Sequence, residues 1–301
     1  ELVYSLRLPA GVVNAGVVVD AAAGTQIDPW FLSAKDENAV QGFAGTPVDV
    51  NELTYDSGED VGAAGVSFPA AGTYYVAVDA NRDRFTGRLL GGRYTLRSWV
   101  NDVTPPSLQL LTARVTAGRP TLVFRALDRQ SGVDPESLTV AYAGALVSVG
   151  RFERSTGLAF FPLPAGVDAL RAGSTRLHMA ASDFQEAKNV DTMGSSIMPN
   201  TRTRTTALRV VAGVTVDWLL PAAGVCAGRR LLEVVAGSPA RVRLVRFAVD
   251  GRVVATDRSG AQGVWAASAR LTRGRHALTA TAVDGRGRTA GSRRMVSVCS
   301  A

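Results

Sequence analysis

The sequence predicts an all-β protein made of three β-sandwich domains in tandem. Apolar and polar residues alternate over short segments, for instance at 73–79 and 93–100, and this two-residue period is typical of half-buried strands. Turn-forming residues recur about every ten positions, and no segment sustains the period of an amphipathic helix. A chain of 301 residues, 46% hydrophobic and 20% charged, is long enough for two or three separate cores.

The first predicted domain, 1–103, is a jelly-roll-like sandwich. The alternation at 2–8 and the apolar run 16–19 indicate strands near its start. Five later residues are expected to face its core: Tyr74, Val76, Val78, Tyr94 and Leu96. The domain should end at Pro105-Pro106, because proline lacks the N–H that a central strand donates.

The second predicted domain, 104–213, is an immunoglobulin-like sandwich. Strand-like segments at 108–111, 120–127 and 138–142 are separated by turn residues at the rhythm of a seven-strand sandwich of about 100 residues. The polar passage 183–206 is longer than most connections, so it is either an ordered crossover between strands or a partner surface.

The third predicted domain, 214–301, is a second immunoglobulin-like sandwich. Asp250-Gly251 is a strong signal for a two-residue hairpin turn. Val245, Phe247 and Val249 are expected to face one way, and Val242 is out of phase with them, which predicts a β-bulge. Its two cysteines, Cys226 and Cys299, stand near its ends.

Edge strands of one sandwich commonly bring such positions together, so we expect a disulfide between Cys226 and Cys299. In the chain-entropy model it would stabilise the domain by about 4 kcal/mol. Two unrelated buried thiols are the alternative. A disulfide in turn favours an oxidising, extracellular setting and a secreted protein.

The net charge of +7 is typical of proteins that bind nucleic acids, but the distribution of the charge argues against such a partner. Nearly all of the positive charge is arginine, spread along strands and turns with a local excess only in the last third. No nucleic-acid-binding signature is present. No apolar run is long enough to span a bilayer either.

The residues suggest no reaction. His178 and His276 are the only histidines; His178 should be exposed beside Leu177 and Met179, and His276 should pack or cap near a strand start. No metalloprotease motif, cysteine pair motif or serine nucleophile elbow occurs. An enzyme complete within this chain would need a pocket of titratable groups that the sequence does not display. We therefore expect no catalytic residue here.

One loop is suited to a calcium ion. Asp79, Asn81 and Asp83 place three oxygen-bearing side chains at alternate positions, as in loops that wrap around hard cations. The glycine and glutamate that complete the helix-loop-helix calcium motif are replaced by Arg84 and Leu90. The alternative is an Asx-rich turn whose side chains bond their own backbone.

A second group of polar residues stands at one end of the second predicted domain: Asp128, Asp134, Asp183 and Asn189. We expect these side chains either to approach one another around a cation or to cap turns. Their separations suit turn capping equally well.

The first domain carries a family resemblance. Its strand ending Leu8-Pro9-Ala10-Gly11, the segment 68–78 (FPAAGTYYVAV) and Tyr94-Thr95-Leu96 resemble the bacterial pre-peptidase C-terminal domain. The whole chain resembles the C-terminal region of actinobacterial subtilisin-like serine proteases, in which such a domain precedes immunoglobulin-like modules. The resemblance implies a noncatalytic accessory region of a secreted endopeptidase, with roles in substrate or surface targeting, export or maturation. Its partner would then be a protease domain upstream of Glu1.

The alternative function is a stand-alone extracellular adhesion protein that binds carbohydrate or protein through loops at a sandwich end. A row of exposed aromatic residues would favour it. The tryptophans are instead scattered, and each is expected in a core or linker: Trp30, Trp99, Trp218 and Trp265. Because no leader follows Glu1, we expect either a processed protein or a fragment.

Overall fold

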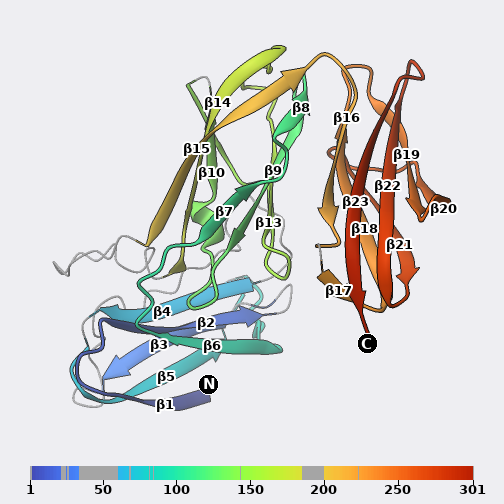
Figure 1. Cartoon of the computed structure of the whole chain (residues 1–301). Helices are drawn as coiled ribbons and strands as arrows, with labels where there is room; N and C mark the ends of the chain where they lie inside the picture. Colours follow the sequence, from blue (N-terminus) through green and yellow to red (C-terminus); the bar gives the residue numbers. More distant parts are fainter. Residues whose placement is uncertain are drawn as a thin grey trace.

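The structure, a computed structural model, describes residues 2–21, 25, 27–33, 60–67, 69–80, 82–83, 85–142, 144–184, 200–222 and 224–300. The named elements within these ranges are β-strands and one short 3-10 helix, η2 (Pro135–Ser137). The strands form sheets that pair into sandwiches following one another along the chain (Figure 1). The predicted all-β fold of tandem β-sandwiches is confirmed. No helix in the described ranges has the length and apolar character of a membrane span.

The first sandwich has two three-stranded antiparallel sheets, ordered β1-β5-β3 and β4-β2-β6. Its strands are β1 (Leu2–Leu8), β2 (Asn14–Ala21), β3 (Ile27–Ser33), β4 (Asp60–Ser67), β5 (Gly72–Ala80) and β6 (Tyr94–Val100). The predicted inward face is confirmed, because Tyr74, Val76 and Val78 are buried in the core between the two sheets. Tyr94 and Leu96 pack against the same core.

The sheet β4-β2-β6 is buried on both faces. Val17 and Val19 of β2 point into the first core, whereas Val18 belongs to the apolar cluster of the second sandwich, together with Trp99 of β6. Figure 1 shows this sheet as the layer of the first sandwich nearest the second. The indole of Trp99 lies against Gly16, where a Cβ would stand 2.2 Å from two ring atoms. Glycine at this position therefore gives Trp99 its space.

Substituting Gly16→Ala is expected to destabilise the first sandwich by about 1–3 kcal/mol, because overpacking forces side chains and backbone to shift. Urea unfolding followed by tryptophan fluorescence measures this loss. Gly72→Ala is the matched control, since Gly72 also lies in a strand and a Cβ there would meet nothing within 4 Å. Equal stability of the two variants would contradict the proposed packing of Trp99.

The second sandwich has sheets ordered β12-β13-β9-β7 and β11-β10-β14-β15-β8. Its strands are β7 (Ser107–Leu110), β8 (Arg114–Thr116), β9 (Thr121–Leu127), β10 (Thr139–Tyr142), β11 (Ala145–Ser148), β12 (Arg151–Glu153), β13 (Leu158–Pro162), β14 (Gly173–Ser182) and β15 (Thr201–Val211). Phe124 and Phe161 stack at a centroid distance of 4.8 Å in its core. Most of the predicted crossover or partner surface, 185–199, lies outside the described residues.

The third sandwich repeats this strand order with one strand fewer, in sheets β16-β18-β21 and β17-β23-β22-β19-β20. Its strands are β16 (Thr215–Leu220), β17 (Gly224–Cys226), β18 (Gly228–Gly237), β19 (Val242–Val249), β20 (Arg252–Asp257), β21 (Val264–Leu271), β22 (Gly274–Asp284) and β23 (Thr289–Cys299). In both sandwiches the second strand pairs in parallel with the last one. The two units therefore share a topology of the immunoglobulin kind.

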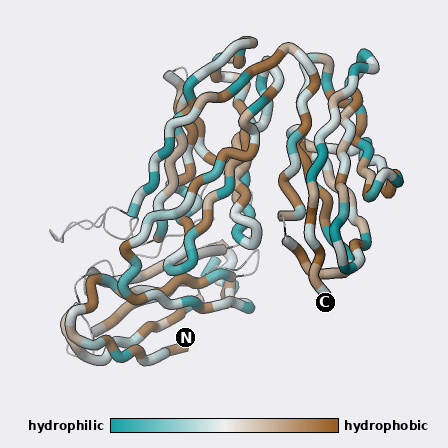
Figure 2. The backbone as a smooth tube through the Cα atoms, viewed as in Figure 1, coloured by the Kyte–Doolittle hydropathy of each residue, from teal (hydrophilic) through white to brown (hydrophobic). Residues whose placement is uncertain are grey.

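Local predictions for the third sandwich are confirmed. Asp250 and Gly251 both have positive φ, 51° and 83°, as a type I′ hairpin turn between β19 and β20 requires. The pairing of β19 with β22 shifts register between Val242 and Leu244, which is the predicted bulge. Val245 and Phe247 are fully buried. Figure 2 shows apolar and polar residues alternating along these strands.

Candidate functional site

The junction between the first two sandwiches is held by charge as well as by apolar packing. The carboxylate of Asp20 on β2 accepts a bond from Nε of Arg97 at 3.2 Å, and its other oxygen accepts one from Nη1 of Arg154, in the turn after β12. The guanidinium of Arg154 also lies 5.6 Å from the ring centroid of Phe184. Asp20 therefore links a strand of the first sandwich to a turn of the second.

Buried hydrogen bonds hold the linker between these sandwiches. Asn14 donates through Nδ2 to the carbonyl of Asp102 at 2.6 Å and accepts the N–H of Asp102 at 2.8 Å. Asn200, which precedes β15, donates to the same carbonyl at 2.9 Å. Asn14 and Asp102 are both fully buried. These bonds satisfy buried polar groups and fix the direction in which the chain leaves β6.

Three carboxylates meet at this junction. Oxygens of Asp102, Asp128 and Asp183 lie within 4.8 Å of one another. The expected approach of Asp128 and Asp183 thus occurs, with Asp102 as a third member that the sequence analysis did not name. Asp134 instead accepts the N–H of Glu136 at 3.0 Å as the cap of η2. Asn189 lies outside the described residues.

Backbone amides engage two of these carboxylates. Asp102 accepts the N–H of Ser131 at 2.8 Å, and Asp128 accepts those of Gln130 and Gly132 at 2.8 and 3.1 Å. Burial, with a smaller contribution from the charge of Asp102, raises the pKa of Asp128, although the two amide bonds oppose this shift. Three carboxylate oxygens at this spacing suit a hard cation. The amide bonds are also those of turn capping, the second alternative left open by the sequence.

The predicted calcium loop follows β5. Asp79 is in the strand, where its backbone pairs with that of Asp28, and Asn81 lies outside the described residues. Asp83 accepts the N–H groups of Phe85 and Thr86 at 2.9 and 2.7 Å. The bond from Thr86 is the main cause that lowers the pKa of Asp83. Asp83 therefore forms an Asx turn, and calcium at this loop stays a prediction.

Thermal melting with and without a calcium chelator tests the loop. If calcium binds, the chelator lowers the melting temperature of the wild type, because a ligand that binds only the folded state stabilises it. The same treatment should leave Asp79→Ala unchanged. A wild-type midpoint that does not respond to the chelator would remove this site.

The two histidines lie where the sequence indicated. His178 is exposed between buried Leu177 and Met179, and its Nδ1 is 2.8 Å from Oγ1 of Thr205 on the neighbouring strand. His276 near the start of β22 pairs with Asp250 at 2.7 Å. That bond is the main cause that raises the pKa of His276. In this arrangement His276 fastens the β19–β20 hairpin to β22.

The junction between the second and third sandwiches has an apolar centre of its own. Outward-facing residues of sheets β12-β13-β9-β7 and β16-β18-β21 form one buried cluster: Val123, Leu158, Phe160, Leu219 and Val235. The hydroxyl of Thr121 donates to the carbonyl of Gln262 across the junction. The two sandwiches therefore bury strand faces against each other, which opposes hinge motion between them.

A buried carboxylate lies beside this apolar centre. Glu233 of β18 is 5% exposed, and its Oε1 is 3.8 Å from a guanidinium nitrogen of Arg151 on β12. Arg151 also pairs with Glu153 at 3.0 Å. Burial, reinforced by the charge of Glu153 and opposed by Arg151, raises the pKa of Glu233 to about 7. The junction therefore contains a group that changes charge near neutral pH.

Asp217 of β16 is a second carboxyl group at this junction whose pKa is raised. Burial raises the pKa of Asp217 to about 6, although the positive charges of Arg114 and Arg294 oppose the shift. Arg114 belongs to the second sandwich and Asp217 to the third. Glu233 and Asp217 thus both lie where the second and third sandwiches meet.

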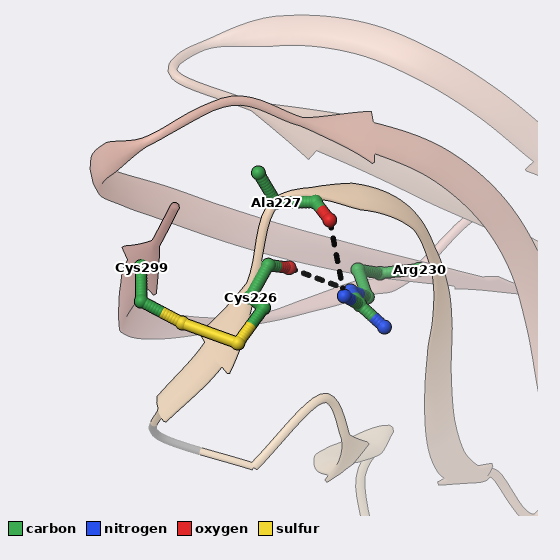
Figure 3. Close-up of a disulfide and its surroundings, with 4 residues drawn as sticks. All are labelled: Cys226, Ala227, Arg230 and Cys299. Atoms are coloured by element: carbon green, nitrogen blue, oxygen red, sulfur yellow. Dashed lines mark hydrogen bonds between the residues drawn. A yellow bond between two sulfur atoms is a disulfide. The ribbon is translucent and has the colours of Figure 1, made fainter. Parts of the chain in front are cut away.

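The predicted disulfide joins Cys226 on β17 to Cys299 at the end of β23 (Figure 3). The two residues are directly opposed in the parallel pairing of these strands, with Cα atoms 4.4 Å apart. Arg230 donates to the carbonyls of Cys226 and Ala227 at 2.7 and 3.1 Å. β17 is an edge strand, whereas β23 lies between β17 and β22, so only one of the two cysteines lies on an edge strand.

Comparisons with known proteins give fold likenesses alone. No protein-family model and no curated protein matches the chain. The solved structures that resemble it include fibronectin(III)-like modules of CbhA from Clostridium thermocellum, at 15% identity and a TM-score of 0.27, over 64% of this chain and 95% of that one. Another is dimeric latent PorU from Porphyromonas gingivalis, at 13% identity and a TM-score of 0.39.

The PorU likeness covers 96% of this chain and 30% of the PorU chain. A third similar structure is SGBP-B of the mixed-linkage glucan utilization locus of Bacteroides ovatus, at 13% identity and a TM-score of 0.28. It covers 93% of this chain and 63% of that one. At this identity the likenesses concern β-sandwich architecture and bring no activity to this chain.

Proposed function

We propose that this chain is a noncatalytic accessory region whose sandwiches hold an attached domain in a fixed position relative to an extracellular surface. The observation that carries the proposal is the pair of packed junctions. Trp99 and Val18 extend the core of the second sandwich into the first, and the cluster around Phe160 joins the second sandwich to the third. Burial of strand faces at each junction makes the array a stiff spacer rather than loosely linked modules.

The attached domain, in this proposal, is the protease domain of a secreted subtilisin-like endopeptidase. The support is the resemblance of 68–78 and 94–96 to the pre-peptidase C-terminal domain, segments that include most of β5 and the start of β6. The disulfide is typical of oxidising, extracellular compartments and fits secretion. Recovering the complete reading frame is the first test, since it should encode a catalytic domain ahead of Glu1.

Deleting 1–301 from such a parent tests the role itself. Hydrolysis of an insoluble protein substrate should fall, because the spacer no longer holds the enzyme near the surface. Hydrolysis of a small soluble peptide should stay unchanged. Equal losses on both substrates would contradict the positioning role. Casein hydrolysis by the isolated chain, abolished by a serine-directed inhibitor, would overturn the noncatalytic assignment.

A stand-alone adhesion or binding protein is the second candidate. An arginine-lined groove between the second and third sandwiches favours it, because such a groove provides a binding surface without any attached enzyme. A secretory leader directly ahead of Glu1 in the reading frame would support this candidate over the first.

A further inference from the structure

We infer that a groove beside the junction of the second and third sandwiches binds an acidic polysaccharide. The groove has a volume of about 880 Å³ and lies between the ends of β8 and β13 and two turns of the third sandwich. Four exposed arginines line it: Arg119, Arg241, Arg243 and Arg258. Among the described residues that line it there is no aspartate or glutamate. This inference deepens the proposed function, on which it rests, because it names the class of extracellular material that the region holds.

The positive charge of the chain is concentrated in the third sandwich, which provides one wall of the groove. Residues 214–301 contain 14 arginines and five acidic residues, a formal charge of +9, whereas 1–213 carry −2. An excess of one sign lining a groove attracts ligands of the opposite sign and raises their association rate. The groove is therefore suited to a polyanion.

The guanidinium groups on the third-sandwich wall remain available to a ligand. Among the described residues, Arg241, Arg243 and Arg258 form no ion pair with a carboxylate. Two carboxylates, those of Asp284 and Asp257, bond to the turns that carry these arginines, but they bind groups other than the arginine side chains of the groove. Asp284 accepts hydrogen bonds from Oγ of Ser238 and Nε of Arg288, both at 2.8 Å. Asp257 accepts a hydrogen bond from the backbone N–H of Ser259 at 2.8 Å.

These carboxylates stabilise the turns that present the arginines. Burial raises the pKa of Asp284, but the hydrogen bonds from Ser238 and Arg288 outweigh it and lower the pKa to about 2. Asp284 therefore stays ionised and bound to its own partners at neutral pH. It holds the turn that precedes Arg241 without neutralising the arginines of the groove.

The groove is also preorganised. Arg119 donates to the carbonyls of Pro164, Ala165 and Val167 at 3.1, 2.8 and 3.0 Å, which fixes its side chain on the second-sandwich wall. The bond from Thr121 to Gln262 ties the two walls together. A groove that is rigid before binding loses less conformational entropy when a ligand enters.

The lining favours a polysaccharide over a peptide or a nucleic acid. Its larger apolar side chains, Leu163, Val242 and Trp265, are buried, so none is open to anchor the side chains of a peptide. Single-stranded nucleic acids stack on exposed aromatic rings, and the one aromatic residue among the described lining residues, Trp265, is buried. Exposed Gln262 offers its side-chain amide to sugar hydroxyls.

Isothermal titration calorimetry of the full chain tests the inference. The probes are polygalacturonate, which carries carboxylates, and dextran sulfate, which carries sulfates, with neutral dextran for comparison. We expect at least one acidic polymer to bind, more weakly at high salt, and neutral dextran not to bind. The combined variant Arg241→Gln, Arg243→Gln and Arg258→Gln should lose about tenfold in affinity, because three exposed charge contacts disappear.

A charge-matched control distinguishes binding in the groove from attraction by the net positive charge of the third sandwich. Arg252→Gln, Arg275→Gln and Arg293→Gln remove the same charge from exposed positions of the third sandwich outside the groove, and should change affinity by about twofold at most. Equal losses in the two triple variants, or no binding by either acidic polymer, would overturn the inference. Poly-L-glutamate or a short DNA duplex binding as tightly, with the same loss in the groove variant, would overturn the polysaccharide assignment.

The two proposals fail in different ways. The deletion experiment on the parent protein compares insoluble and soluble substrates and does not depend on these arginines. A negative result in calorimetry with a positive result in the deletion experiment would reject the groove and keep the accessory role.

Discussion

Replacing Cys226 and Cys299 together by serine is expected to lower the free energy of unfolding of the third sandwich by about 4 kcal/mol. The disulfide closes a loop over a sequence separation of 73 residues, and the chain-entropy model gives this magnitude for a loop of that length. The bond also retains β17, a strand of three residues that pairs with β23 alone. Without it, this edge strand should fray.

Urea unfolding of wild type and variant measures this loss, and a reducing agent supplies the control. Reduction should shift the wild-type midpoint to that of the double serine variant and should leave the variant unchanged. Serine is close to reduced cysteine in size and cannot form a disulfide. The difference between wild type and variant therefore measures the covalent bond. A wild-type midpoint that does not respond to reduction, despite loss of the bond, would contradict the expected stabilisation.

Local structure could be predicted well because it depends on neighbouring residues. The alternation around Val76 specified which face of β5 is buried, and the Asp250-Gly251 pair specified a hairpin turn. The bulge at Val242 followed from a break in the same alternation. Each of these signals acts over fewer than about ten residues, the range over which period and turn chemistry are informative.

The junctions could not be predicted, because they depend on how separate sandwiches dock. The run of buried residues in β2 indicated a strand, but only the structure shows that Val17 and Val18 belong to different cores. The same holds for β9, where Val123 faces the third sandwich while its neighbours face the second core. An unbroken apolar run in an antiparallel sheet is the one available signal that both faces are covered.

The polar residues of the junctions were missed for a related reason. Asp20 and Arg154 are 134 positions apart, and no motif links them. Asp102 stands just before Pro105-Pro106, and in the sequence this segment indicates a domain border and no site. For Asp128 and Asp183 the sequence leaves two alternatives open, approach around a cation or turn capping, and the structure brings their carboxylate oxygens within 4.8 Å of each other.

Replacing Glu233 by glutamine is expected to remove the pH dependence of stability that this carboxyl group causes at the junction of the second and third sandwiches. The folded pKa of about 7 lies above the ordinary value of 4.5, so the folded state binds the proton more tightly than the unfolded state. The contribution of Glu233 to stability should therefore be greatest below pH 4.5, fall as the pH rises through 7, and stay lower above that. A shift of this size corresponds to about 3 kcal/mol.

Unfolding of wild type and Glu233→Gln between pH 5 and 8 tests this expectation. Glutamine preserves the shape of the side chain but carries no charge, so the variant should be the more stable protein at pH 8 and should approach the wild type near pH 5. Other groups, such as His276, titrate in both proteins, and the difference between the two curves isolates Glu233. Glu136→Gln, an exposed position in η2 of the second sandwich, should follow the wild-type curve. Parallel curves for wild type and Glu233→Gln would show that Arg151 neutralises the carboxylate fully, and that the junction holds a stable ion pair instead of a buried, titrating acid.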